Sequence, residues 1–113
     1  MAHDEGMKAL SAQFDQKLHD LYEQIVREVP GYRPTAFLAM LNELGGVETA
    51  RRLNADVTDG FTRLWEEGRL DLAVEAAMIQ VPSRRLFTRA ELVAAQDRLD
   101  DALAHLPPSR RRR

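Results

Sequence analysis

The sequence predicts an all-α fold: a compact single-domain bundle of about five to six short helices with a buried central helix. Three observations support this prediction. Apolar residues recur at steps of three and four along most of the chain. Glycine and proline interrupt these stripes at intervals that suit short helices. One apolar segment resembles a buried strand, but no second run of that kind exists to pair with it.

The first two helices occupy the first part of the chain. A stripe of apolar side chains predicts a helix over about residues 7 to 29. Proline and glycine at residues 30–31 end it, because proline disfavours helical geometry in the residue before it. The second helix begins at Pro34, where a first helical turn tolerates the missing donor. The glycines at residues 45–46 end it as a left-handed cap.

Two shorter helices follow. Apolar spacing predicts a two-turn helix over residues 47–53 and a further helix over residues 59–67. Thr58 or Asp59 is the expected N-cap of the second one, because a short side-chain oxygen can accept from a free backbone N–H. Gly68 ends it.

The fifth helix is expected over residues 72–81, with Asp71 as its cap. Only Glu75 and Gln80 are polar between that cap and Pro82. A helix that is apolar all round is normally buried all round. A buried parallel strand is the alternative, and the alanines of the segment disfavour it.

The end of the chain divides into a helix and a tail. Thr88 and Glu91 have the spacing of a capping box and predict the start of the last helix. Residues 1–106 are therefore expected to form one helical domain. Residues 107–113 contain no apolar side chain, so they are expected to be a disordered basic tail.

Composition excludes several classes of protein. The chain has 16 lysines and arginines against 18 acidic residues, and it has no cysteine. Disulfides, thiolate metal sites and a cysteine nucleophile are thereby excluded. No apolar run is long enough to cross a membrane, and residues 1–5 lack the basic and apolar regions of a secretion signal. We therefore expect a cytoplasmic protein with no membrane partner.

Three motifs occur in a fixed order along the chain. They read GGVExAxRL at residues 45–53, DGFTxLWExGRLDLxVEA at residues 59–76, and LFTxxEL at residues 86–92. With this order of motifs the chain resembles a widespread group of small uncharacterised bacterial helical proteins. The resemblance covers about residues 20 to 100. It implies a small helical fold, and it implies no reaction, ligand or cofactor.

The motifs of known catalysis and metal binding are missing. His19 and the carboxylate of Asp15 have a helical ligand spacing, but a metal site needs three or four converging ligands. No serine lies in a glycine-flanked elbow. The backbone amides at residues 45–46 could hold a phosphate, but Glu48 in the same turn would repel it. We expect no metal and no cofactor, and a non-catalytic protein is favoured over an enzyme.

Glu75 is the residue of greatest chemical interest. A carboxylate on a buried helix must find hydrogen-bond donors or keep its proton. Arg69 or Arg52 is the expected partner, so Arg69, Asp71 and Glu75 are interpreted as a structural polar network that holds the fourth helix against the fifth. A small-ligand or enzymatic site around Glu75, with Arg69 and Trp65, is the alternative.

The leading hypothesis for function is a non-catalytic interaction or regulatory module that binds another macromolecule, in first place a protein. A domain of this size can only just surround so apolar a fifth helix, so a partner or a second copy of the chain would cover one side. The candidate interface consists of five apolar or aromatic residues in the second half of the chain: Phe61, Trp65, Leu70, Leu72 and Ile79.

The second hypothesis is a nucleic-acid-associated regulator. The third and fourth helices could form a helix-turn-helix, but the acidic side chains of the fourth helix would be repelled by phosphates. Weak contact through basic residues remains open. The candidates are Arg51, Arg52, Arg84, Arg85, Arg89 and, in the tail, Arg110, Arg111, Arg112 and Arg113. Whether the tail has a role is left open.

Overall fold

The computed structural model of the chain describes residues 2–105. The predicted basic tail, with the four candidate arginines at residues 110–113, lies outside them. The described part contains six α-helices, two 3-10 turns and no strand, which confirms the all-α single-domain bundle. In chain order the elements are α1 (Ala2–Glu28), α2 (Thr35–Leu44), α3 (Gly46–Asn54), α4 (Asp59–Glu66), η1 (Leu70–Leu72), α5 (Val74–Met78), η2 (Ser83–Leu86) and α6 (Arg89–Ala104).

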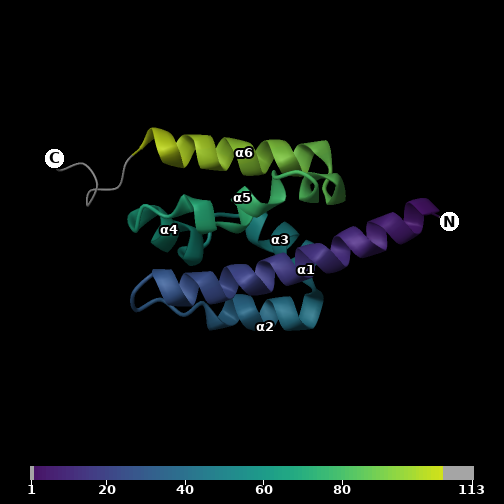
Figure 1. Ribbon diagram of the computed structural model, residues 1–113. Helices are drawn as coiled ribbons and strands as arrows, with labels where there is room; N and C mark the ends of the chain where they lie inside the picture. Colours follow the sequence, from purple (N-terminus) through teal and green to yellow (C-terminus); the bar gives the residue numbers. More distant parts are fainter. Residues whose placement is uncertain (1, 106–113) are drawn as a thin grey trace.

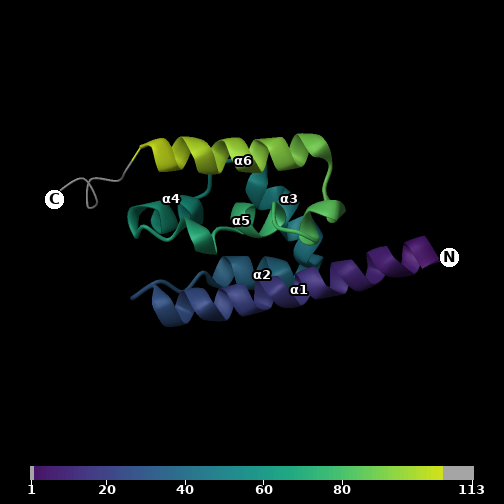
Figure 2. The ribbon, with the colours of Figure 1, turned by 45° about the horizontal axis from the view of Figure 1, so that its top comes forward.

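The helices lie in three layers (Figure 1). Helices α1 and α2 form one outer layer, α6 forms the other, and α3, α4 and α5 lie between them. Figure 2 shows the same order of layers from a second direction, with the N-terminal end of α1 reaching beyond the other helices. The middle layer is therefore covered on both sides, which explains why its side chains are apolar on more than one face.

Two clusters of apolar side chains form the core. The first contains Phe14 and Leu18 of α1 together with Met78 of α5, all of which are almost completely buried. The rings of Phe14 and Phe87 meet edge to face, with 5.3 Å between their centroids. Burying a side chain of this size contributes about 1.5–3 kcal/mol. The apolar stripe of α1 therefore supplies much of the stability of the bundle.

The junction between α2 and α3 requires glycine at two successive positions. Gly45 ends α2 with a φ of 82°, which an L side chain rarely adopts. A Cβ at Gly46 would lie 2.8 Å from Asp15 Oδ1 and 3.2 Å from Asp15 Cα. A glycine therefore ends α2 at a positive φ, but its ψ of 169° lies outside the left-handed helical region, so the cap is not the left-handed one that was predicted. Gly46 allows α3 to approach α1 closely.

The predicted caps of two helices are present. Thr58 Oγ1 accepts a hydrogen bond of 3.1 Å from the backbone N–H of Phe61 at the start of α4. At the start of α6, Thr88 Oγ1 accepts from the N–H of Glu91, and the Glu91 carboxylate accepts from the N–H of Thr88. Both reciprocal bonds of the capping box are therefore formed, as the sequence indicated.

Two helix boundaries differ from the prediction. α1 begins at Ala2 and not near residue 7, because a helix can continue past the end of its apolar stripe. α5 is only five residues long and begins after Ala73, whose ψ of 148° is extended. Asp71 lies in η1 and is not the N-cap of α5. Residues 72–79 are buried or half-buried as predicted, whereas Val81 is 76 % exposed. The segment is a 3-10 turn followed by a short helix and not the single helix that was predicted.

Candidate functional site

A cavity of about 400 Å³ lies between α1, α2, α4 and the η1–α5 segment. Its wall comes from α1, α2, α3, α4, η1 and α5, so no single stretch of the sequence defines it. Most of the wall is apolar, as expected for a site that binds small molecules. The apolar lining includes Leu21, Ile25, Phe37, Met40, Leu53, Phe61, Leu64, Leu72 and Val74.

A buried ion pair lies beside this cavity. Glu75 is 3 % exposed, and its Oε2 accepts a hydrogen bond of 2.9 Å from Nη1 of Arg98 on α6. The same nitrogen donates to the backbone oxygens of Asn54 at 3.0 Å and Asp56 at 3.2 Å. Of the two charged residues, Glu75 lines the cavity. Glu75 is therefore a lining residue whose charge is compensated by Arg98, which does not line the cavity.

Tyr32 and Gly60 lie at the polar edge of the cavity. A Cβ at Gly60 would be 2.7 Å from the Tyr32 hydroxyl oxygen, so glycine leaves room for that hydroxyl. The Arg63 guanidinium lies over the Tyr32 ring, 5.2 Å from its centroid. Burial raises the pKa of Tyr32, the positive charge of Arg63 opposes this shift, and the net direction is upward. The hydroxyl is therefore a neutral group at this edge.

The predicted polar network is only partly correct. Arg69 binds Asp71 at 3.0 Å, and it also binds Glu28 of α1 at 2.8 Å. The hydrogen bond from Arg69 lowers the pKa of Asp71, although burial opposes it. Glu75 does not belong to this network, because Arg98 is its partner. Arg69 therefore connects α1 to η1, and the prediction that it neutralises Glu75 was wrong.

Arg98 is the functional residue that the sequence interpretation missed. It directly precedes Leu99, which is buried on the inner face of α6, and it lies three residues after the buried Ala95. An arginine at the border of an apolar helical stripe often reaches the core through its long aliphatic stem. That position was the signal that could have identified it as the partner of Glu75.

The predicted interface residues do not form an exposed surface. Phe61, Leu70 and Leu72 are each less than 10 % exposed. They belong to the second of the two core clusters, which also contains Ile25 of α1, Val29 just after α1 and Leu99 of α6. Trp65 and Ile79 are half-buried and pack against that core. The Trp65 indole N–H donates to the backbone oxygens at residues 102 and 105, at 3.0 and 2.7 Å. These five residues stabilise the bundle, because α1 and α6 already cover the faces that were expected to need a partner.

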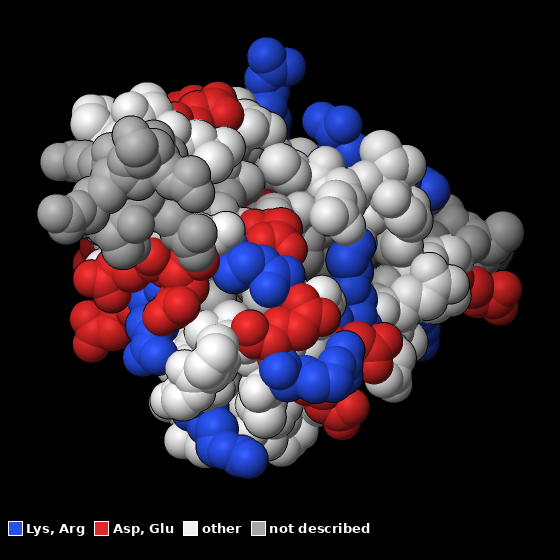
Figure 3. Space-filling model, turned by 60° about the vertical axis from the view of Figure 1, so that its left-hand side comes forward, with Lys and Arg blue, Asp and Glu red and all other residues white. Residues whose placement is uncertain are grey.

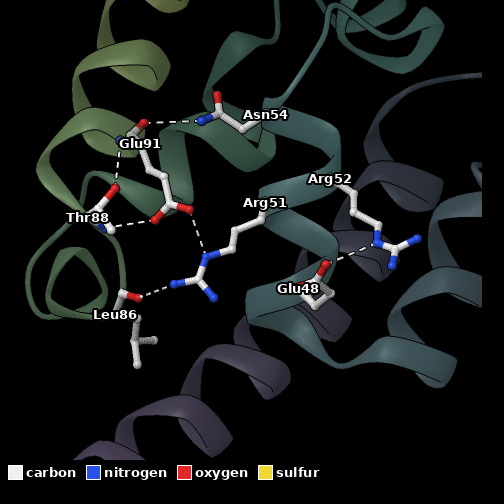
Figure 4. Close-up of polar contacts among 7 residues, drawn as sticks. All are labelled: Glu48, Arg51, Arg52, Asn54, Leu86, Thr88 and Glu91. Carbon is white, nitrogen blue, oxygen red and sulfur yellow. Dashed lines mark hydrogen bonds and ion pairs between the residues drawn. The ribbon is translucent and has the colours of Figure 1, made fainter.

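Both candidate basic residues of α3 form ion pairs with acidic side chains of the chain (Figure 4). Arg51 binds Glu91 Oε2 at 2.8 Å and also reaches the backbone oxygen of Leu86, whereas Arg52 turns to Glu48 on its own helix. Burial would raise the pKa of Glu91, but hydrogen bonds from Thr88 and Arg51 lower it overall. Arg51 and Arg52 therefore have local partners in place of phosphates.

The remaining candidate arginines in the described part are surface residues. Arg84, Arg85 and Arg89 are exposed around η2 and the start of α6. On the face drawn in Figure 3, basic and acidic side chains alternate and do not form a continuous basic area. This distribution gives a phosphate backbone no extended basic surface on that face.

The residues that were considered as metal or phosphate ligands have partners within the chain. Both ring nitrogens of His19 lie near acceptors: the backbone oxygen of Asp15 at 2.9 Å and Oδ1 of Asn42 at 3.0 Å. The Gly46 N–H donates to Asp15 Oδ1 at 2.5 Å, so a carboxylate of the chain occupies the position that a phosphate would take. Within residues 2–105, no group of three or more potential metal ligands is present.

The fold and this site together define a small all-helical protein with a buried ion pair beside an apolar cavity. No family model, curated protein or solved structure matches the chain. The resemblance of residues 20–100 to small bacterial helical proteins therefore stays a prediction. Over the described residues, each helix is too short or too polar to cross a membrane.

Proposed function

We propose that this protein is a non-catalytic ligand-binding domain and that its site is the apolar cavity between α1, α2, α4 and the η1–α5 segment. The observation that supports this most strongly is the cavity itself. Its volume of about 400 Å³ falls within the range of about 300–1,000 Å³ that is usual for small-molecule sites. The ligand class that suits such a wall is a compact, mainly apolar organic molecule.

A small molecule is favoured over a protein partner by the burial of the expected interface. Phe61 and Leu72 face the core and the cavity, and they do not form part of an exposed apolar surface. In the described part of the chain the exposed large apolar residues are Val57 and Val81, which lie in two different loops, and Val93 and Leu103, which lie ten residues apart on α6. Scattered apolar residues of this kind are normal on a protein surface and do not indicate an interface.

Binding is favoured over catalysis by the distribution of titratable groups. Acid–base catalysis usually requires two such groups whose environments differ and which both reach the reacting atoms. Of the titratable residues of the lining, Glu75 is buried and already paired with Arg98. Tyr32 is half-buried and keeps its proton, because burial raises its pKa. Arg33 and Asp59 line the cavity at exposed positions. This arrangement suits a site that holds a ligand by apolar contact.

The proposal can be tested by titrating the ¹⁵N-labelled protein with indene and naphthalene, two compact molecules without polar groups. We expect saturable chemical-shift changes at the backbone amides of Phe37, Phe61 and Val74, which line three sides of the cavity. Changes confined to residues outside the lining, or no saturable change with either molecule, would contradict the proposal.

Two exposed alanines of α2 provide a matched pair of variants. Ala36 lines the cavity, whereas Ala39 lies on the same helix outside the lining. We expect Ala36→Trp to weaken binding at least tenfold, because the indole ring occupies the entrance. Ala39→Trp should bind as the wild type does. Equal affinity of both variants would show that the molecules enter elsewhere.

A further inference from the structure

The carboxylate of Glu75 indicates the chemistry of the ligand, and this inference rests on the proposed function. Oε2 accepts from Arg98, and within residues 2–105 no hydrogen bond reaches Oε1. The buried side-chain atoms without a partner in this part of the chain are Thr49 Oγ1 and Asn54 Oδ1. Oε1 is therefore still accessible, and Glu75 is one of the residues that line the cavity.

An accessible acceptor in an apolar wall discriminates between ligands. A carboxylate oxygen that loses water without gaining a donor costs free energy, because desolvation is then not compensated. When a ligand without a donor fills the cavity, Oε1 has lost its water and has no hydrogen-bond donor. A ligand with one suitably placed N–H or O–H replaces the lost water. The site should therefore prefer apolar molecules that contain a donor.

The ion pair with Arg98 indicates that this donor is uncharged. The guanidinium of Arg98 lies 2.9 Å from the carboxylate, so the negative charge of Glu75 is already compensated. An ammonium group would lose its hydration in an apolar cavity and would lie close to a second positive charge. An anionic ligand would be placed against the Glu75 carboxylate itself. A neutral indole N–H or hydroxyl avoids both costs.

We propose that the cavity selects a compact, uncharged aromatic or apolar ligand that has one hydrogen-bond donor, and that this donor binds Oε1 of Glu75. The apolar wall supplies affinity, and Glu75 supplies selectivity. Phe61 and Leu72 contact the body of the ligand, and Arg98 holds the carboxylate in position from α6.

Indole, benzofuran and indene test this proposal, because they share one shape and differ in a single ring position. We expect indole to bind the wild-type protein about tenfold more tightly than the other two, since only indole donates to a charged acceptor. Benzyl alcohol should also bind more tightly than benzylammonium. Dissociation constants come from ¹⁵N chemical-shift titrations of the full chain.

Glu75→Gln is the variant that separates selectivity from affinity. The amide oxygen of the glutamine can still accept a hydrogen bond from Arg98. The amide NH₂ then takes the place of Oε1, so a donor replaces the acceptor. We expect the preference for indole over indene and benzofuran to fall below about twofold, because the acceptor that distinguishes the three ligands is removed. The wild-type comparison among the three ligands remains decisive even if this variant does not fold.

The outcomes distinguish this inference from the proposed function. If indole, benzofuran and indene bind the wild type equally, the cavity binds ligands but Glu75 does not select them, and the inference is wrong. If benzylammonium binds more tightly than benzyl alcohol, the site selects cations and the inference is also wrong. If the indole preference survives in Glu75→Gln, the donor binds elsewhere. If none of the molecules binds, the proposed function fails as well.

Discussion

Oε2 of Glu75 lies 2.9 Å from Nη1 of Arg98, which is 23 residues further along the chain. This ion pair connects α5, in the middle layer, to α6, in an outer layer. The Arg98 side chain is 17 % exposed and that of Glu75 is 4 % exposed. Solvent therefore screens the pair only weakly, and each residue depends on the other for compensation of its charge.

Removing Arg98 should destabilise the protein strongly. We expect Arg98→Met to lower the free energy of unfolding by about 3 kcal/mol, because it leaves a buried carboxylate uncompensated. The double variant Glu75→Leu/Arg98→Met should recover most of this loss. Urea denaturation followed by circular dichroism measures both. Arg52→Met is the control, since its pair with Glu48 is exposed and contributes below about 1 kcal/mol. Equal losses in Arg98→Met and Arg52→Met would contradict the prediction.

Two glycines should respond in opposite directions to the same substitution. Gly46→Ala places a Cβ 2.8 Å from Asp15 Oδ1 and against the backbone of α1, so we expect a loss of about 1–3 kcal/mol. Gly6 of α1 has no neighbouring atom within 4 Å of the added Cβ, so Gly6→Ala should stabilise by about 0.5 kcal/mol. Thermal and urea unfolding of both variants test this. A stabilising Gly46→Ala would show that α1 and α3 are not in close contact.

Thr49 has a buried hydroxyl that should cost stability. Thr49 is 0 % exposed, and its Oγ1 has no partner among the described residues. Valine has the same shape without the polar atom, so we expect Thr49→Val to raise the free energy of unfolding by about 1 kcal/mol. Thr62→Val, at an exposed position of α4, should change it by less than about 0.5 kcal/mol. A loss of stability in Thr49→Val would reveal a hydrogen bond of that hydroxyl in solution.

His19 should make the contact between α1 and α2 sensitive to pH. The hydrogen bond with Asn42, followed by that with the Asp15 carbonyl, raises the pKa of His19 above 6.5, because only the protonated ring donates from both nitrogens. A raised pKa in the folded state means that the contribution to stability is complete below pH 6.5. It is lost as the pH rises through the folded-state pKa.

NMR titration of the His19 ring checks this shift directly. We expect Asn42→Ala to bring the pKa of His19 back toward 6.5, because the largest cause of the shift is removed. His19→Gln should abolish the corresponding pH dependence of the unfolding free energy. A wild-type pKa below 6.5 would mean that the ring is not protonated between these two acceptors.

Local signals in the sequence were sufficient for the secondary structure of most of the chain. The cap at Thr58, the capping box at Thr88 and Glu91, and the glycine that ends α2 depend on neighbours within a few residues. Hydrogen bonds and backbone preferences of that range are encoded locally. The segment at residues 70–78 was the exception, because its apolar side chains could be satisfied equally by one helix or by a turn and a shorter helix.

The site could not be predicted to the same extent. Burial of Glu75 followed from its apolar surroundings, but its partner did not, because Arg69 and Arg98 were both available in the chain. Arg69 is engaged by Glu28 and Asp71 in the folded protein. Which arginine reaches a buried carboxylate depends on how the layers pack. The position of an arginine in the sequence does not give its distance from that carboxylate in the folded protein.

The amino-acid sequence alone determined that this protein is helical, where most of its helices begin and end, and that the segment around Glu75 is buried. These properties depend on periodicity and on contacts within one turn. The tertiary structure decided that Arg98 neutralises Glu75, that Phe61, Leu70 and Leu72 are core residues, and that a cavity remains between four segments. These are contacts between distant positions, and side-chain packing in three dimensions sets them.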